Sequence, residues 1–128
     1  MKLLLDTATF LWLVSDAPEL SEEAREVFAD PENDVYLSSV SAWEIAIKHA
    51  LGKLPLPAAP ARFVPLQRKQ HGIEPLQLDE EAALHLTHLP PLHKGPFDRM
   101  LICQAVVHHL AILTPDELIQ QYPVRTIW

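Results

Sequence analysis

Short apolar runs alternate with longer amphipathic segments along the whole chain. A run of four to six apolar or β-branched residues that ends at turn residues is typical of a buried strand. On this basis we expect strands over residues 2–5, 35–38 and 110–113, a final strand over 124–127, and a short edge strand over 73–78. The edge position is expected because Pro75 cannot donate to a sheet ladder.

The longer segments have the periodicity and the end signals of helices. They predict helices over residues 7–14, 21–29, 41–50, 61–70, 79–88 and 97–109, and a short one that opens at Thr114-Pro115. In the helix over 79–88, Ala82, Ala83 and Leu86 should face inward. Pro96 can start the next helix because its missing N–H would have no partner there anyway. That helix is apolar on most sides and should be central.

Strands therefore alternate with helices, which favours an α/β fold. Alternation of this kind implies parallel strands, right-handed crossovers and helices on both faces of one sheet. The 128 residues fit one compact domain over 1–128, with no internal repeat or flexible linker.

Composition narrows the choice of compartment. Cys103 is the single cysteine, so no disulfide can form within the chain, which fits a reducing environment. The opening Met1-Lys2-Leu3-Leu4-Leu5 does not resemble a signal peptide, since Asp6 interrupts it and no cleavage site follows. No apolar run approaches the roughly 18 residues that a membrane span needs. We expect a cytoplasmic protein.

Charge weighs against one class of partner. The formal net charge is −7, whereas nucleic-acid binders usually carry a basic face. Carboxylates gathered around a cation would account for part of the excess. Basic clusters over residues 48–53 and 62–71 could contact phosphates or could be solvated helix faces.

Four acids stand where parallel strands end or helices begin. Asp6 ends the first expected strand, Glu44 lies one turn into the helix after the second, Asp98 opens the central helix, and Asp116 follows the strand over 110–113. Each has a structural explanation: Asp6 could cap a helix, Ser41-x-x-Glu44 and Thr114-x-x-Glu117 read as capping boxes, and the helix dipole favours Asp98 and Asp116.

Taken together, the same acids predict a metal site. In parallel α/β sheets ligands bind beyond the carboxyl ends of the strands. Four carboxylates there would repel one another unless a cation lay among them. Oxygen ligands suit Mg²⁺, or Mn²⁺, and the histidines show no zinc-ligand spacing. Such a site can activate water and stabilise a scissile phosphate.

Four stretches then resemble one family in order, spacing and context. They are Leu3-Leu4-Leu5-Asp6-Thr7, Ser41-Ala42-Trp43-Glu44-Ile45-Ala46-Ile47-Lys48 with Leu51-Gly52-Lys53-Leu54, Pro96-Phe97-Asp98-Arg99-Met100-Leu101-Ile102-Cys103-Gln104-Ala105, and Leu113-Thr114-Pro115-Asp116-Glu117. They are similar to the signatures of PIN-domain proteins of the VapC toxin type. One departure is Ala8, where relatives often carry His.

The resemblance implies more than the residues alone. It implies a PIN-like α/β/α sandwich with a central, mostly parallel sheet. It implies metal-dependent endonucleolytic cleavage of RNA by the toxin of a type II toxin–antitoxin pair, a homodimer, and inhibition by a cognate antitoxin through which the complex binds operator DNA. Asp6, Glu44 and Asp98 match the family's acidic triad, and Asp116 matches its fourth acid.

Residues beside the acids have two interpretations each. Thr7 and Thr114 could hold a water at the metal or could cap helices. Arg99 could grip a phosphate or make a surface ion pair, and His93 and Lys94 could reach the substrate. Cys103 should be a core residue. Trp12, Trp43 and Phe97 could be core or dimer contacts, or they could stack on bases.

Three other functions stay open. An aspartyl-phosphate phosphatase or a phosphoacceptor receiver is disfavoured, because Ala8 stands where the first wants a second Asp and Asp6 has no acidic neighbour. A non-catalytic PIN-fold protein-binding module would not need the acids. A nuclease acting on DNA or structured nucleic acid would use the same metal chemistry.

Overall fold

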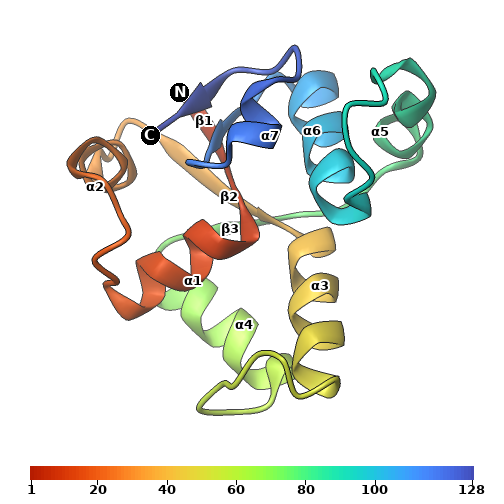
Figure 1. Cartoon of the computed structure of the whole chain (residues 1–128). Coiled ribbons are helices and arrows are strands. Elements are labelled where there is room, and N and C mark those ends of the chain that lie inside the picture. The colour runs from red at the N-terminus through yellow and green to blue at the C-terminus, as the bar shows by residue number, and fades with distance from the viewer.

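The computed structural model describes all 128 residues, built around one parallel sheet (Figure 1). The strand order is β3-β2-β1-β4-β5. The strands are β1 (Lys2–Leu5), β2 (Asp34–Ser38), β3 (Glu74–Leu76), β4 (Ala111–Leu113) and β5 (Thr126–Ile127). Every pairing is parallel, so the α/β fold with a central parallel sheet is confirmed.

Helices connect the strands on both faces. They are α1 (Thr7–Ser15), α2 (Glu22–Ala29), α3 (Ser39–Ala50), α4 (Pro60–Gln70), α5 (Glu80–Leu84), the 3₁₀ helix η1 (His85–His88), α6 (Pro96–His108) and α7 (Glu117–Gln120). In Figure 1, α6 and α7 lie on one side of the sheet, and α1, α2 and α4 lie on the other. No helix is both long enough and apolar enough to span a membrane.

The alternation of side chains along β1 divides the core into two layers. Leu3 and Leu5 pack with Phe10 of α1 and Phe63 of α4 on one face of the sheet. Leu4 points the other way, into a cluster built mainly from α6. All three leucines are fully buried, as a period of two requires of a central strand covered on both faces.

One expected helix is divided. The segment 79–88 forms α5 and then the tighter η1. Ala82 is fully buried, but Leu86 is 37% exposed, so its predicted inward position was wrong. The apolar contact is made by Leu89 instead, which is buried in the α6 layer and whose N–H donates to the carbonyl of Leu86. A final 3₁₀ turn is a common way to satisfy the last carbonyls of a helix.

Other differences concern boundaries. The edge strand covers three residues rather than six, and the final strand covers only Thr126 and Ile127. The helix α3 begins at Ser39, two residues earlier than expected, because Ser38 ends β2 and its hydroxyl accepts the N–H of Val40. Cys103 is a free, buried thiol of α6, which confirms the core assignment.

Candidate active site

Four carboxylates from separate segments line one cavity at the carboxyl edge of the sheet. Asp6 directly follows β1, Glu44 lies in α3, Asp98 lies in the first turn of α6, and Asp116 is the N-terminal cap of α7. The cavity has a volume of about 400 Å³, and Thr7 is also part of its wall. The topology brings them together because parallel strands end at the same edge.

Asp6 occupies a cap position without capping. It precedes α1, but its side chain makes no hydrogen bond to the helix N-terminus. Its Oδ2 instead accepts from Thr114 Oγ1 at 2.7 Å. The Asp6 side chain is therefore directed across the edge of the sheet toward the segment after β4 and is free of the first helical turn.

Burial makes ionisation of Asp6 unfavourable. The residue is only 7% exposed. Loss of solvation raises the pKa of Asp6 to about 6, the Thr114 hydrogen bond acts against the rise, and the negative charges of Asp98, Asp116 and Glu44 add to it. A cation in the cavity would stabilise the ionised form of Asp6 and so offset both the lost solvation and the repulsion by the other acids.

Thr114 and Asp116 form a local structure that differs from the expected capping box. Asp116, rather than Thr114, caps α7, and its carboxylate accepts the N–H of Leu118. Thr114 is fully buried. Its oxygen accepts the N–H of Asp116 while its hydroxyl proton goes to Asp6. The expected capping box of Thr114 and Glu117 is therefore absent, because the Thr114 hydroxyl donates to Asp6, far away in the sequence, and Asp116 caps the helix.

The second expected capping box is also absent. Ser41 lies inside α3 and is fully buried. Its oxygen accepts a hydrogen bond of 2.8 Å from Thr7 Oγ1. Thr7 and Ser41 therefore join α1 to α3, the helices that adjoin Asp6 and contain Glu44.

Glu44 has one oxygen paired and one unpaired. The residue is 7% exposed, and its Oε2 makes an ion pair with Lys48 one turn further along α3. Its Oε1 is buried and has no hydrogen-bond partner. A buried carboxylate oxygen without a partner costs stability, so some partner is expected there.

Asp98 is less buried but is perturbed in the same direction. Burial raises the pKa of Asp98, and the charges of Asp116 and Glu44 raise it further. His93 acts against this rise, its Nε2 lying 3.6 Å from Asp98 Oδ2. Two acids of one cavity thus resist ionisation.

The donor set fits a hard divalent cation. All four acids supply oxygen ligands, one buried oxygen of Glu44 is unpaired, and the pKa of Asp6 and of Asp98 is raised. As the side chains stand, no group of three His, Cys, Asp or Glu residues is positioned to hold an ion. Binding would therefore require the carboxylates to rotate inward, and Mg²⁺ commonly completes its shell with water.

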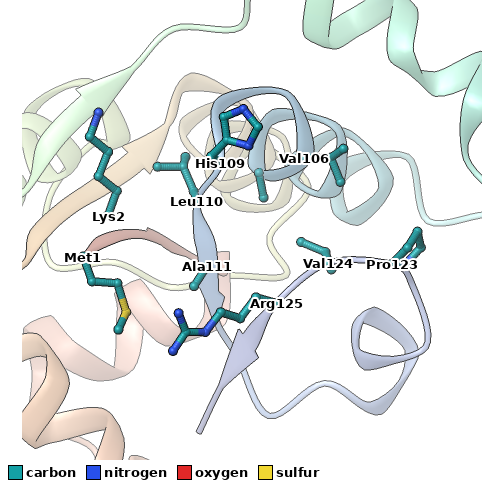
Figure 2. A pocket seen from close by; sticks show the side chains of 10 residues that line it. Met1, Lys2, Val106, His109, Leu110, Ala111, Pro123, Val124 and Arg125 are labelled. Carbon is teal, nitrogen blue, oxygen red and sulfur yellow. The ribbon is translucent and has the colours of Figure 1, made fainter.

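The largest hollow of the molecule lies elsewhere. It has a volume of about 440 Å³ and lies at the amino edge of the strands. Figure 2 shows Lys2, His109 and Arg125 around it, and no carboxylate lines it. Because ligands of parallel sheets bind at the opposite edge, the smaller acidic cavity is the better candidate.

The remaining candidates separate into two groups. Lys48 and Lys53 line the acidic cavity, whereas none of the basic residues over 62–71 does so. Arg99 does not line it either; its Nε is buried without a partner, and it makes no ion pair. Trp43 is 59% exposed and packs edge-on against Phe97 at 5.2 Å between centroids.

Sequence reasoning missed three roles. Ser41 was interpreted as a cap, although its spacing from Glu44 also puts it on the buried side of α3. Lys48 was assigned only to a basic cluster, although four residues from Glu44 is the spacing of a helical ion pair. Tyr122, which contacts His93, carried no signal in the sequence.

Known proteins resemble this chain in sequence and in fold. Ribonuclease VapC16 of Mycobacterium tuberculosis is 41% identical over 69 residues, which are 54% of this chain and 49% of that protein. The match thus spans about half the length of that relative. VapBC2 from Rickettsia felis, bound to a promoter DNA fragment, has 15% identity and a TM-score of 0.72, with 99% of this chain and 98% of that chain covered.

DNA-bound VapBC from Salmonella typhimurium has 22% identity and a TM-score of 0.69, with 99% of this chain and 97% of that chain covered. These two structural likenesses concern the fold alone. The model of the PIN domain family matches residues 3–124, nearly the whole chain, so this protein belongs to the PIN domain family.

Proposed function

We propose that this protein is a metal-dependent endoribonuclease and the toxin of a type II toxin–antitoxin pair. The observation that carries the proposal is the set of four carboxylates, Asp6, Glu44, Asp98 and Asp116, around one cavity of a PIN-family chain. The name of the half-matching relative, a ribonuclease, supports the reaction. The names of the structural neighbours, toxin–antitoxin complexes, support the partner.

In this proposal the four acids hold Mg²⁺, with Mn²⁺ as a substitute. When bound, the ion supplies an activated water and stabilises charge on the phosphate. Asp6 is oriented by Thr114, and the hydroxyl pair of Thr7 and Ser41 fixes α1 against α3. These contacts hold the Asp6 carboxylate, and α1 relative to the helix that carries Glu44, before substrate arrives.

Two cations of the chain would attract the substrate. Lys48 and Lys53 line the same cavity as the acids. Their charges favour a phosphodiester, which the net charge of −7 would otherwise repel. Lys48 also makes an ion pair with one oxygen of Glu44. This pairing would weaken the repulsion between the Glu44 carboxylate and the RNA backbone.

We infer the partners from the same resemblance. A cognate antitoxin would block the acidic cavity, and an Arg or Lys side chain placed among the carboxylates would compete with the cation. The complex would bind operator DNA through the antitoxin only. The toxin itself would be a cytoplasmic homodimer.

The test is cleavage by the purified chain without antitoxin. Single-stranded RNA, structured RNA and single-stranded DNA would be incubated with Mg²⁺, with Mn²⁺ and with EDTA. Asp6→Asn and Asp98→Asn would be compared with Glu32→Gln, which removes one exposed turn charge that is not part of the cavity wall. We expect cutting of RNA by the wild type and Glu32→Gln with metal only, and a loss of about a hundredfold or more in the two site variants.

The opposite results would reject the proposal. Cleavage that persists in EDTA or in both site variants would indicate a contaminant. Intact RNA under every condition would favour a PIN-fold binding module without activity. Faster cleavage of DNA than of RNA would support the metal-dependent reaction but show that DNA is the preferred substrate.

A further inference from the structure

A histidine outside the acidic set is held in place by a tyrosine from the far end of the chain. His93 lies in the loop before α6 and is only 13% exposed at its side chain. Its Nδ1 lies 2.8 Å from the hydroxyl of Tyr122, in the segment after α7. The backbone N–H of His93 donates to the same hydroxyl at 3.3 Å, and the two rings pack edge to face at 5.4 Å between centroids.

These hydrogen bonds assign the proton on the His93 ring. The Tyr122 oxygen already accepts the backbone N–H. Tyr122 is 3% exposed, so its hydroxyl proton needs a partner inside the protein, and Nδ1 of His93 is the acceptor within reach. A neutral ring that accepts at Nδ1 carries its proton on Nε2.

The protonated nitrogen faces the candidate site. Nε2 of His93 is buried, has no hydrogen-bond partner, and lies 3.6 Å from Oδ2 of Asp98. A small inward movement would turn this contact into a hydrogen bond to the carboxylate. One oxygen of Asp98 would then be fixed by His93, and the other would stay available to a cation.

A glycine leaves room for the contact. A Cβ atom at Gly95 would lie 3.0 Å from His93 Nε2 and 3.4 Å from Asp98 Oδ2. The φ angle of Gly95 is −61°, a value that any residue adopts, so backbone freedom does not explain the glycine here. The absence of a side chain at Gly95 instead leaves space for the His93 imidazole beside the Asp98 carboxylate.

Resting on the proposed metal site, we propose that His93 is a positioning residue for Asp98, oriented by Tyr122 and given room by Gly95. Partners that orient a metal ligand typically change metal affinity by about tenfold to a hundredfold when removed. The arrangement adds a function for a loop histidine and for a tyrosine that are not part of the cavity wall.

The test is the affinity for Mn²⁺, measured by calorimetric titration of the whole chain without nucleic acid. Gln places an amide donor near the position of the histidine Nε2, whereas Leu has no donor. We expect binding about tenfold weaker or worse in His93→Leu and within about threefold of wild type in His93→Gln. Tyr122→Phe and Gly95→Ala should weaken binding by about threefold to tenfold.

Controls separate positioning from general damage. Tyr36→Phe alters the other tyrosine of the chain, which makes no side-chain hydrogen bond, and should bind as the wild type does. Denaturation by urea would show that each variant is folded. Long-range ¹H–¹⁵N spectra of the histidine ring should show the proton on Nε2 in the wild type and a mixture of tautomers in Tyr122→Phe.

The possible results distinguish the two proposals. Wild-type affinity in folded His93→Leu, equal losses in His93→Gln and His93→Leu, or a proton on Nδ1 in the wild type would overturn the role of His93. A wild-type chain that binds no Mn²⁺, or Asp98→Asn that binds it as well as wild type, would instead overturn the metal site.

Discussion

Replacement of Asp6 by Asn should stabilise the protein in the absence of divalent cations, while it abolishes the proposed nuclease activity. The pKa of this acid is about 6, against an ordinary value of 3.8. The folded chain therefore binds more protons than the unfolded chain between these values. The contribution of Asp6 to stability should accordingly be most favourable below about pH 4 and should be lost as the pH rises through about 6.

The shift sets the size of the effect. A difference of about two pKa units corresponds to about 3 kcal/mol, and the residue is too buried for solvent to screen much of it, at 7% exposure. Asn keeps the shape and can still accept from Thr114, but it carries no charge. We expect Asp6→Asn to raise the free energy of unfolding by about 2–3 kcal/mol at about pH 7 in EDTA, and by almost nothing at about pH 4.

Urea denaturation would measure this, with the fluorescence of the three tryptophans as the signal. Glu32→Gln, which removes an exposed charge, is the matched control and should leave stability nearly unchanged at both pH values. Mg²⁺ at about a hundred times its dissociation constant should stabilise the wild type by about 2.7 kcal/mol and Asp6→Asn far less. A variant no more stable than wild type at about pH 7, or equally stabilised at both pH values, would refute the reasoning.

Two further substitutions test the contacts around the site. Thr114→Val removes the donor to Asp6, and we expect Mn²⁺ to bind about tenfold more weakly in a calorimetric titration; unchanged binding would contradict the role of the hydroxyl. Gln104→Leu removes a fully buried amide that accepts from Ser38, and we expect a loss of about 1–3 kcal/mol in thermal unfolding, whereas a gain would show that the amide is dispensable.

Much of the fold could be predicted from the periodicity of apolar residues and from the turn residues that end each segment. The three leucines of β1 form the central strand, and short apolar runs between helices leave few alternatives to a parallel sheet. The grouping of the acids follows from the same rule, since Asp6, Asp98 and Asp116 adjoin strand ends or helix starts. The alternation of strands and helices thus predicted that these acids lie at the carboxyl edge of the sheet.

Side-chain partners could not be predicted in the same way. Ser41 was expected to cap α3, but Ser38 does so, because the start of the helix depends on where β2 stops. Thr114 bonds to a residue 108 positions away, and no local signal encodes that. The end of the segment 79–88 was predicted wrongly because the chain tightens there into η1, after which Leu89, rather than Leu86, is buried.

The order of strands in space has a consequence for synthesis. The first strand made, β1, is central, and one of its two neighbours, β4, is among the last. A ribosome-bound chain that has not yet produced β4 exposes one edge of β1, and its Asp6 lacks the hydroxyl that holds it. Pairing over such a separation is slow and completes only when most of the chain is available. Under the proposed ribonuclease function, this delay would keep the nascent chain harmless to the message and the ribosome that are producing it.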